Sequence, residues 1–257
     1  MSGGHIAKPG DIPCVLVFAG LDPSGGAGLL ADAEAVRVAG ARPLCVATAL
    51  TARTTRRMHG FQPLSPTLAL QTAEALLEEE PVRAIKVGML GTSAMARAIA
   101  GLLEQARLPA VVDPVLAASS GAALFQGGPA AAREAYSALW PHAVLTPNAG
   151  EARVLLDLSE DPRDVPALER AARELVRRGA KAALVKGGHA EGVEAVDVLC
   201  AEGRCDHLAA PRLDRTARGT GCRLASAVAA GLAQGRALPE AARLAKHLVL
   251  EYLRSPD

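Results

Sequence analysis

Short apolar runs alternate with longer segments of helical periodicity along most of this chain, and this alternation limits the possible folds more than any other feature. Short runs rich in β-branched residues are typical of buried strands. Strands separated by helices form right-handed crossovers and a mostly parallel sheet. We therefore expect an α/β fold with strands over residues 14–19, 44–50, 84–87, 110–112, 143–145 and 182–185.

The segments between these runs predict helices over residues 28–38, 67–79, 93–106, 129–139, 150–156 and 165–178. Several of them open with Ser, Thr or Pro and close with Gly or Pro. Residues 195–200 and 204–208 are close enough in sequence to form an antiparallel hairpin at one edge of the sheet. Helices near 221–233 and 239–253 complete a single domain over residues 12–257, after a loose tail of residues 1–11.

Composition excludes two classes of partner. The chain has 28 Lys and Arg against 27 Asp and Glu, and a net charge of +1 provides no basic surface for a phosphate backbone. One Trp, two Tyr and three Phe leave few rings to stack on bases. No apolar run reaches the roughly 18 residues that a membrane span needs. The sequence therefore predicts a protein that binds neither nucleic acid nor a membrane.

The five cysteines predict no metal or disulfide framework. They are Cys14, Cys45, Cys200, Cys205 and Cys222, an odd number without a CxxC pair. Cys200 and Cys205 flank residues that are typical of a turn between two strands. We expect reduced thiols in a cytoplasmic protein.

A glycine-rich segment, residues 20–28, follows the first predicted strand and precedes a helix. Its glycines allow the backbone to approach a ligand closely. It is not a Walker A loop because Gly28 is followed by two leucines rather than by Lys and Ser or Thr. A dinucleotide fingerprint also fails, because no Asp or Glu between residues 35 and 73 is available to hold a ribose. A turn that serves packing alone is the alternative.

A second motif, Arg218-Gly219-Thr220-Gly221-Cys222, stands immediately before a predicted helix. Free N–H groups and the positive end of the helix dipole there suit a transferring phosphoryl group. The same field would lower the pKa of the Cys222 thiol and make it a proton acceptor. The alternative is a small buried cysteine at a helix start.

Two further motifs follow predicted strands. Asn148 and Glu151 offer oxygens for water-mediated Mg²⁺, or else form the capping box of a helix. Lys186, ahead of two glycines, could meet a nucleotide phosphate, or else stand in an ordinary turn. Because all of these motifs lie just past predicted strand ends, one crevice could hold them, and together they match the needs of phosphoryl transfer.

Seven segments, in order, resemble one known family: AGLDPSGGAGLLAD (19–32), TAL (48–50), KVGML (86–90), VVDPV (111–115), TPNAGEA (146–152), VKGGH (185–189) and GTGC (219–222). The chain is similar over about residues 13–253 to the hydroxymethylpyrimidine kinase/phosphomethylpyrimidine kinases of thiamine biosynthesis, in the ribokinase-like superfamily. The resemblance implies a three-layer α/β/α sandwich and a homodimeric kinase that uses ATP and Mg²⁺. The other possibilities are a pyridoxal-type kinase and a non-catalytic binding protein.

The resemblance also implies roles for individual residues. The pyrimidine pocket would use Gly20, Asp32, Met89 and Val115, with Asp32 bonding a ring nitrogen or the amine. Cys222 would be the base, and the backbone of Gly219, Thr220 and Gly221 would hold the transferred phosphoryl group. Asn148 and Glu151 would orient Mg²⁺, and Lys186 would face the ATP phosphates together with Asn148.

This chain departs from the family pattern at several charged positions. Arg53 stands where a Gln usually contacts the pyrimidine, and we hypothesise that it binds the phosphate of an already phosphorylated pyrimidine. The alternative is that Arg53 points to solvent with neighbouring arginines. Ser119 and Ala122 replace a Lys and an Asp, whereas Arg218 and Arg223 add cations beside the phosphate hole, where they could replace the lost charge.

Overall fold

The predicted apolar runs lie side by side in one sheet in the computed structural model, which describes residues 12–118, 120–188, 194–215 and 217–255. The strands are β1 (Cys14–Leu21), β2 (Arg42–Arg53), β3 (Met58–Pro63), β4 (Val82–Val87), β5 (Ala110–Val112), β6 (Val144–Leu145), β7 (Ala182–Val185), β8 (Glu194–Ala201) and β9 (Arg204–Pro211). Across the described residues the order is β3-β2-β1-β4-β5-β6-β7-β8-β9. Neighbours from β2 to β7 are parallel, whereas β8 and β9 form an antiparallel edge hairpin. The predicted sheet is confirmed.

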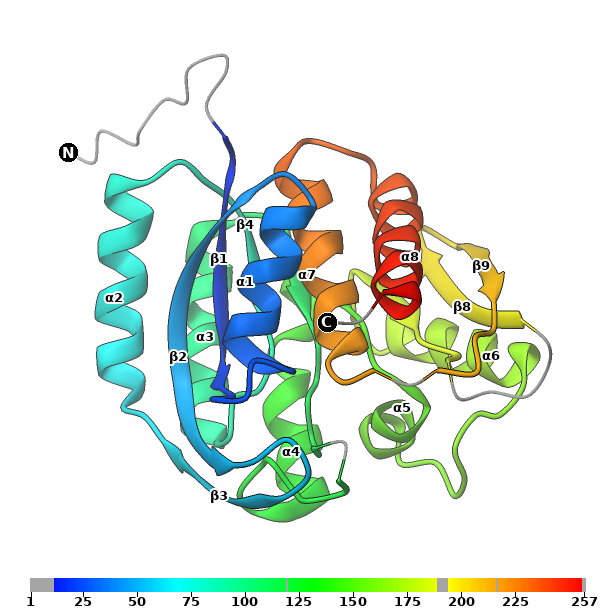
Figure 1. Ribbon diagram of the computed structural model, residues 1–257, viewed down its shortest axis with the longest axis horizontal. Coiled ribbons are helices and arrows are strands. Elements are labelled where there is room, and N and C mark those ends of the chain that lie inside the picture. The colour runs from blue at the N-terminus through cyan, green and yellow to red at the C-terminus, as the bar shows by residue number, and fades with distance from the viewer. Residues whose placement is uncertain (1–11, 119, 189–193, 216, 256–257) are drawn as a thin grey trace.

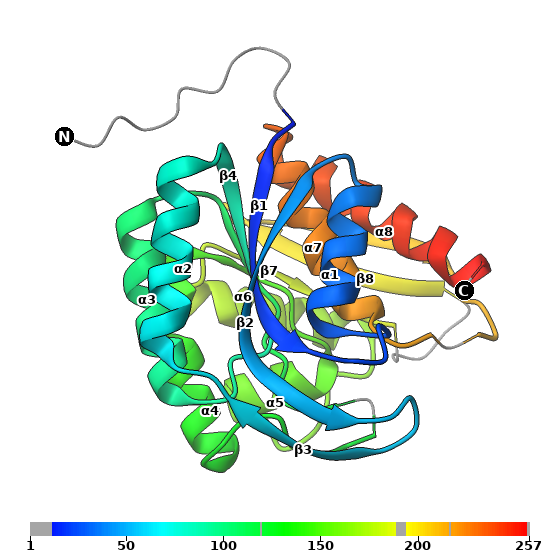
Figure 2. The same cartoon turned by 60° about the vertical axis from the view of Figure 1, so that its left-hand side comes forward.

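Helices cover both faces of this sheet, as Figures 1 and 2 show. One layer contains α2 (Pro66–Glu79), α3 (Ser93–Ala106), α4 (Gly128–Ser137), α5 (Ala149–Leu156) and α6 (Val165–Arg177), and a 3₁₀ turn, η1 (Trp140–His142), follows α4. The other layer contains α1 (Gly28–Val38), α7 (Thr220–Ala233) and α8 (Leu238–Arg254). The described part of the chain is thus a three-layer α/β/α sandwich, and none of its helices has the length and apolar character needed to cross a bilayer.

Strand β1 shows why two helical layers form. Its side chains alternate between the faces of the sheet, so Leu16 and Phe18 pack with α2 and α3 while Val15 and Val17 pack with α1 and α7. All four are fully buried. A strand that is apolar on both faces stays in the interior only when helices cover both faces.

The antiparallel edge strand β3 is absent from the sequence prediction. Residues 58–63 contain Gly60 and Pro63 and show no clear apolar alternation, so only pairing with β2 makes them a strand. Strand β2 also runs beyond its predicted end to Arg53. The β2–β3 hairpin therefore extends past the ends of the neighbouring strands, where Figure 2 shows it below α1 and beside α4.

The prediction that the cysteines are unpaired is wrong for one pair. Cys200 and Cys205 form a disulfide bond. The hairpin places them directly opposite each other in the β8–β9 ladder, so a spacing that excludes a larger framework still allows one cross-strand bond. Cys14, Cys45 and Cys222 are free. The predicted tail, residues 1–11, lies outside the described residues.

Candidate active site

The sequence motifs meet at one edge of the sheet. Strands β1, β4, β5, β6 and β7 are parallel, so the segments that follow them all emerge at the same edge. Lys186 pairs with Asn148 across two of these strand ends. The motifs at Gly20, Asn148 and Lys186 therefore lie at one edge of the sheet, and the single crevice stays a prediction.

Two glycine-rich loops touch at this edge. Gly219 is the N-cap of α7 and adopts a left-handed backbone conformation, with φ of 72°. A Cβ at this position would lie 2.2 Å from the Gly26 carbonyl oxygen, so only glycine allows this approach. No side chain caps this end of α7, which leaves the first-turn amides of Thr220 and Gly221 without a side-chain acceptor. The arrangement is suited to an anion.

Lys186 stands beside this helix start. Its Nζ is 2.7 Å from Asp113 Oδ1 and 3.9 Å from Glu151 Oε2. A Cβ on Gly221 would lie only 2.8 Å from the same Nζ. Burial works against the charge, but Asp113 and Glu151 raise the pKa of Lys186 above its ordinary value. The ammonium group is thus held charged next to the first turn of α7.

Asn148 and Glu151 form the capping box that sequence analysis kept as an alternative. Asn148 Oδ1 accepts from the Glu151 N–H at 2.9 Å, and Glu151 Oε2 accepts from the Asn148 N–H at 2.8 Å. Within the described ranges, no group of three or more His, Cys, Asp or Glu side chains is placed to hold a metal ion. The two carboxylates of Asp113 and Glu151 nevertheless share one ammonium. Their buried excess of negative charge fits a hydrated divalent cation, held through water.

Glu151 gives a pH-dependent prediction. Burial raises its pKa to about 7, although Lys186 acts in the opposite direction. Between pH 4.5 and about pH 7, Glu151 is protonated in the folded chain but ionised in the unfolded chain. The free energy of unfolding therefore falls as the pH rises through this range. We expect Glu151→Gln to be nearly neutral at about pH 4 and to raise the free energy of unfolding by up to about 3 kcal/mol at about pH 8.

Chemical denaturation of Glu151→Gln and the unmodified chain at both pH values, without divalent cations, measures this difference. Because the other titratable groups are the same in both proteins, their contributions cancel in the difference in stability at each pH. An equal stability difference at the two pH values would contradict the raised pKa.

Cys222 lies in the first turn of α7, as predicted, and is partly exposed. The predicted direction of its pKa is wrong. Burial and the nearby carboxylate of Asp32 raise the pKa of Cys222 to about 12, while Lys86 and the Gly28 N–H oppose this only in part. Desolvation outweighs the helix dipole, so the group is a thiol at neutral pH.

Asp32, which is predicted to bond the pyrimidine, lies in the interior of the protein. It has no exposed surface, and its two oxygens accept from Lys86 Nζ at 2.7 Å and from Ser226 Oγ at 2.8 Å. Lys86 is also fully buried, and although burial acts against it, the charge of Asp32 raises the pKa of Lys86. Both oxygens are thus engaged by partners within the protein. The bond from Asp32 to the pyrimidine, which the resemblance implies, stays a prediction.

Gly20, Met89 and Val115 do come together. A Cβ on Gly20 would lie 2.7 Å from Met89 Sδ, and Met89 belongs to a small apolar cluster beneath the β2–β3 hairpin that Val115 also contacts. Ala122 packs against the same cluster, whereas Ser119 lies outside the described residues. This cluster forms an apolar wall next to the glycine-rich loops, and we call it the acceptor wall.

Arg53 and Arg218 converge on Asp22. Arg218 Nη2 is 2.6 Å from Asp22 Oδ2, and Arg53 Nε is 3.6 Å from Asp22 Oδ1. The side chain of Arg53 is only 7% exposed, so the alternative that it points to solvent is wrong. Burial opposes ionisation, but hydrogen bonds from Ser24 and the two guanidinium groups lower the pKa of Asp22. Arg218 thus binds the loop after β1.

Arg223 lies beside the start of α7, because a Cβ on Gly219 would be 3.0 Å from its Nη1. Its guanidinium pairs with Glu34 at 2.6 Å and stacks on the Tyr252 ring at 4.0 Å. Its Nη1 also donates to the Gly26 carbonyl oxygen at 3.5 Å. Arg223 therefore joins the first glycine-rich loop to α7 beside the phosphate hole, with its charge paired to Glu34.

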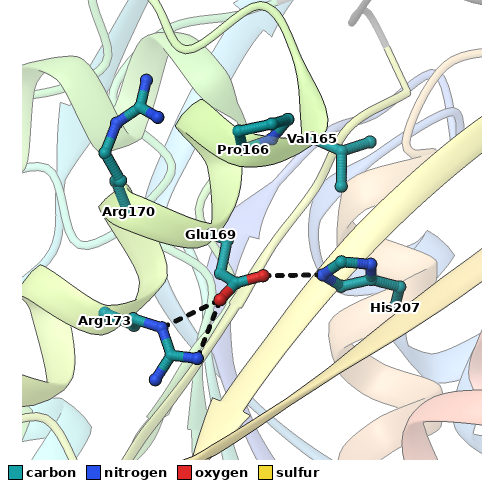
Figure 3. Close-up of a pocket in the computed structure, with 6 residues that line it drawn as sticks. All are labelled: Val165, Pro166, Glu169, Arg170, Arg173 and His207. Atoms are coloured by element: carbon teal, nitrogen blue, oxygen red, sulfur yellow. Dashed lines mark hydrogen bonds and ion pairs between the residues drawn. The ribbon is translucent and has the colours of Figure 1, made fainter.

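A hollow between α6 and β9 is unrelated to these motifs. Figure 3 shows Glu169 between Arg173 and His207, with its oxygens at 2.8 Å from both side chains. Val165, Pro166 and Arg170 complete the lining. The Glu169 carboxylate in this hollow is therefore already paired with two side chains.

Comparison with known proteins supports the phosphoryl-transfer chemistry inferred from the site. The chain matches the phosphomethylpyrimidine kinase family model over residues 22–256. It belongs to this family. A hydroxymethylpyrimidine/phosphomethylpyrimidine kinase of Streptomyces coelicolor is 40% identical over 240 residues, 92% of this chain and 87% of the relative.

Solved structures show the same fold for this family member. A phosphomethylpyrimidine kinase of Clostridium difficile is 31% identical, with a TM-score of 0.77 over 94% of this chain and 99% of the other. A pyridoxal kinase of Bacillus subtilis, in an ADP complex, is 27% identical, with a TM-score of 0.85 over 95% and 93% of the two chains. The predictions of a ribokinase-like sandwich and of a phosphotransferase are confirmed.

Several polar residues of this kinase were given no role from sequence. Asp22, Lys86 and Asp113 stand in the matching motifs, but they gain their importance only from their partners. A signal for Lys86 was present, because a charged residue within a predicted buried strand requires a buried partner. No local pattern identifies that partner as Asp32.

Proposed function

We propose that this chain is an ATP-dependent kinase that phosphorylates the hydroxymethylpyrimidine precursor of thiamine, its monophosphate, or both. The observation that carries the proposal is the position of the Lys186 ammonium beside Gly221, at the uncapped start of α7. A fixed cation and unpaired amides at one point suit the charge on a transferring phosphoryl group. Family membership supports the pyrimidine acceptor.

Each side of the crevice has its own task. The amides of Gly219, Thr220 and Gly221 bind the transferred phosphoryl group, and Lys186 neutralises phosphate charge on the nucleotide side. Gly20, Met89 and Val115 line the acceptor side. The acceptor oxygen forms a bond to the γ-phosphorus as the bond to the ADP oxygen breaks. Positioning and fixed charge supply most of the catalysis in such transfers.

Asn148 and Glu151 would hold Mg²⁺ through its water shell. When bound, Mg²⁺ would supply positive charge that offsets the negative charge developing on the phosphates. The capping box keeps both side chains at the strand ends in advance, and the carboxylate of Asp113 adds charge without a further ligand contact.

Cys222 is proposed to accept the proton of a hydroxymethyl acceptor. Because burial holds it as a thiol at neutral pH, it acts through a small ionised fraction. We expect Cys222→Ala to lower kcat for the hydroxymethyl acceptor by about 10²-fold, the lower end of general-base contributions. Steady-state kinetics with Cys222→Ser as a matched variant checks this. A kcat within about threefold of the unmodified chain for Cys222→Ala would contradict a role as base.

Mass spectrometry of the products tests the function itself. The purified protein is incubated with Mg-ATP and, separately, with hydroxymethylpyrimidine, its monophosphate and pyridoxal. We expect a pyrimidine monophosphate or diphosphate and an equal amount of ADP. Pyridoxal phosphate alone would select a pyridoxal kinase, a possibility that the TM-score of 0.85 with such a kinase keeps open. Thermal stabilisation by the pyrimidines without ADP release would indicate a non-catalytic binding protein.

Cytoplasmic location and a homodimeric state, which the resemblance implies, stay predictions.

A further inference from the structure

The pair Arg53 and Arg218 brings excess positive charge to the rim of the acceptor side. Two guanidinium groups face the single carboxylate of Asp22, which is 4% exposed. Arg218 also donates to Ser24 Oγ at 3.0 Å and to the Thr55 carbonyl oxygen at 3.3 Å. The cluster thus joins the loop after β1, the β2–β3 hairpin and the segment before α7. Among the described residues, these two guanidinium groups therefore share one carboxylate, which leaves one positive charge in excess.

The uncompensated charge belongs to Arg53. Its Nε donates to the Thr54 carbonyl oxygen at 3.2 Å, but among the residues that the structure describes neither terminal nitrogen has a hydrogen-bond partner. The side chain is more than nine-tenths buried. Burial and the charge of Arg218 lower the pKa of Arg53, although Asp22 opposes this. Its terminal nitrogens are not among the fully buried atoms that lack a partner, so an anion can reach them, and a guanidinium suits a bidentate anion.

The position of Arg53 indicates that the anion it binds belongs to the acceptor molecule rather than to the nucleotide. Arg53 follows a register irregularity in β2 and pairs with Met58 across the β2–β3 hairpin, and Met58 packs against the acceptor wall. Ala49 belongs to the acceptor wall, and Thr51 donates to the Leu21 carbonyl oxygen at the end of β1. Arg218 directly precedes Gly219, whose amide belongs to the phosphate hole. The cluster therefore borders the acceptor wall through the β2–β3 hairpin and the phosphate hole through Arg218.

We propose that Arg53, supported by Arg218, binds the phosphate of an already phosphorylated pyrimidine, so that this kinase prefers the monophosphate to the free hydroxymethyl compound. This inference rests on the proposed function and adds a preference between its two acceptors. Asp22 is a positioning residue in it, because it fixes Arg218 and lies beside Arg53 without facing the acceptor.

Proton chemistry agrees with this preference. A phosphomonoester with a second pKa near 6 is mostly a dianion at neutral pH. Its oxygen attacks the γ-phosphorus of ATP, the bond to the ADP oxygen breaks, and no proton has to leave the acceptor. A hydroxymethyl acceptor must lose a proton, and in this structure Cys222 is a thiol that accepts it poorly. The site therefore binds the charged acceptor better and also needs less base catalysis to phosphorylate it.

The test compares kcat/KM for hydroxymethylpyrimidine and for its monophosphate in Arg53→Gln. Loss of a charge-assisted bond to phosphate is expected to lower the monophosphate-to-hydroxymethyl ratio by about 10–100-fold, mostly through KM. Arg56→Gln, in the exposed turn of the same hairpin, is the matched control and should leave the ratio unchanged. Isothermal titration with the monophosphate should show the same loss of affinity without turnover.

The two proposals fail in different ways. If the unmodified protein phosphorylates neither pyrimidine, the proposed function is wrong. If it phosphorylates the pyrimidines and Arg53→Gln changes neither the ratio nor the affinity for the monophosphate, the role of Arg53 is wrong and the function stands. Arg53→Lys should recover only part of the preference, because an ammonium cannot make the bidentate contact. Full recovery would overturn the bidentate binding mode.

Discussion

Replacing Lys86 with methionine is expected to lower the free energy of unfolding by about 3–5 kcal/mol. The substitution removes the ammonium group and leaves the fully buried carboxylate of Asp32 with Ser226 as its remaining partner. An ionised carboxylate without a counter-ion in the interior has to be neutralised or solvated, and both cost folding energy. Denaturant unfolding of the purified variant gives the change directly.

Two further variants show whether the loss of stability in Lys86→Met comes from an unpaired buried charge or from the change of side chain alone. The double substitution Lys86→Met with Asp32→Asn should be more stable than Lys86→Met alone, because it removes the unpaired charge. Arg153→Met breaks an ion pair with Asp161 in which both side chains are nearly half exposed, and such pairs contribute little. If Lys86→Met were as mild as Arg153→Met, the Lys86–Asp32 pair would not stabilise the fold as we infer.

The substitution Gly219→Ala is expected to reduce kcat/KM by about 10³-fold. A new Cβ would collide with the Gly26 carbonyl oxygen, which forces the two glycine-rich loops apart and displaces several amides of the proposed phosphate hole together. Loss of one such donor typically lowers kcat by about 10²–10³-fold. Displacement of several donors together is therefore expected to give a loss at the upper end of this range. Steady-state kinetics on the preferred pyrimidine provides the measurement.

Gly235→Ala is the matched control for backbone strain. Gly235 has a φ of 80°, close to that of Gly219, but a Cβ there would meet no atom within 4 Å. Both variants should therefore lose a similar amount of stability from the left-handed conformation, about 1–2 kcal/mol, while only Gly219→Ala should lose most of its activity. Equal activity in the two variants would show that the contact between the loops does not organise catalysis.

Local patterns were enough to predict most of the sheet and the helices. The run that forms β1 is apolar at every position, which predicts a strand covered on both faces. The helices that begin after Ser65, Thr92 and Asp164 are capped by these side chains, and the preference of Ser, Thr and Asp for N-cap positions is a local property. The order of motifs along the chain also indicated a kinase, because loops that follow parallel strands must emerge at one edge. These inferences depend only on neighbours in sequence.

Contacts between distant residues decided the rest. The Gly219–Gly221 motif indicated an anion site, yet the pKa of Cys222 follows from burial near Asp32, which lies far away in sequence. Asp32 is paired with Lys86 in the interior, and the charge of Arg223, beside the start of α7, is paired with Glu34. Charge, burial and partner of a side chain are set by the packing of α1, α7 and β4 against one another. The sequence by itself therefore determined which elements form and which edge of the sheet holds the candidate catalytic residues. Only the tertiary structure decided which charged groups are paired in the interior. It also decided which groups, like the Arg53 guanidinium, have donors without a hydrogen-bond partner among the described residues.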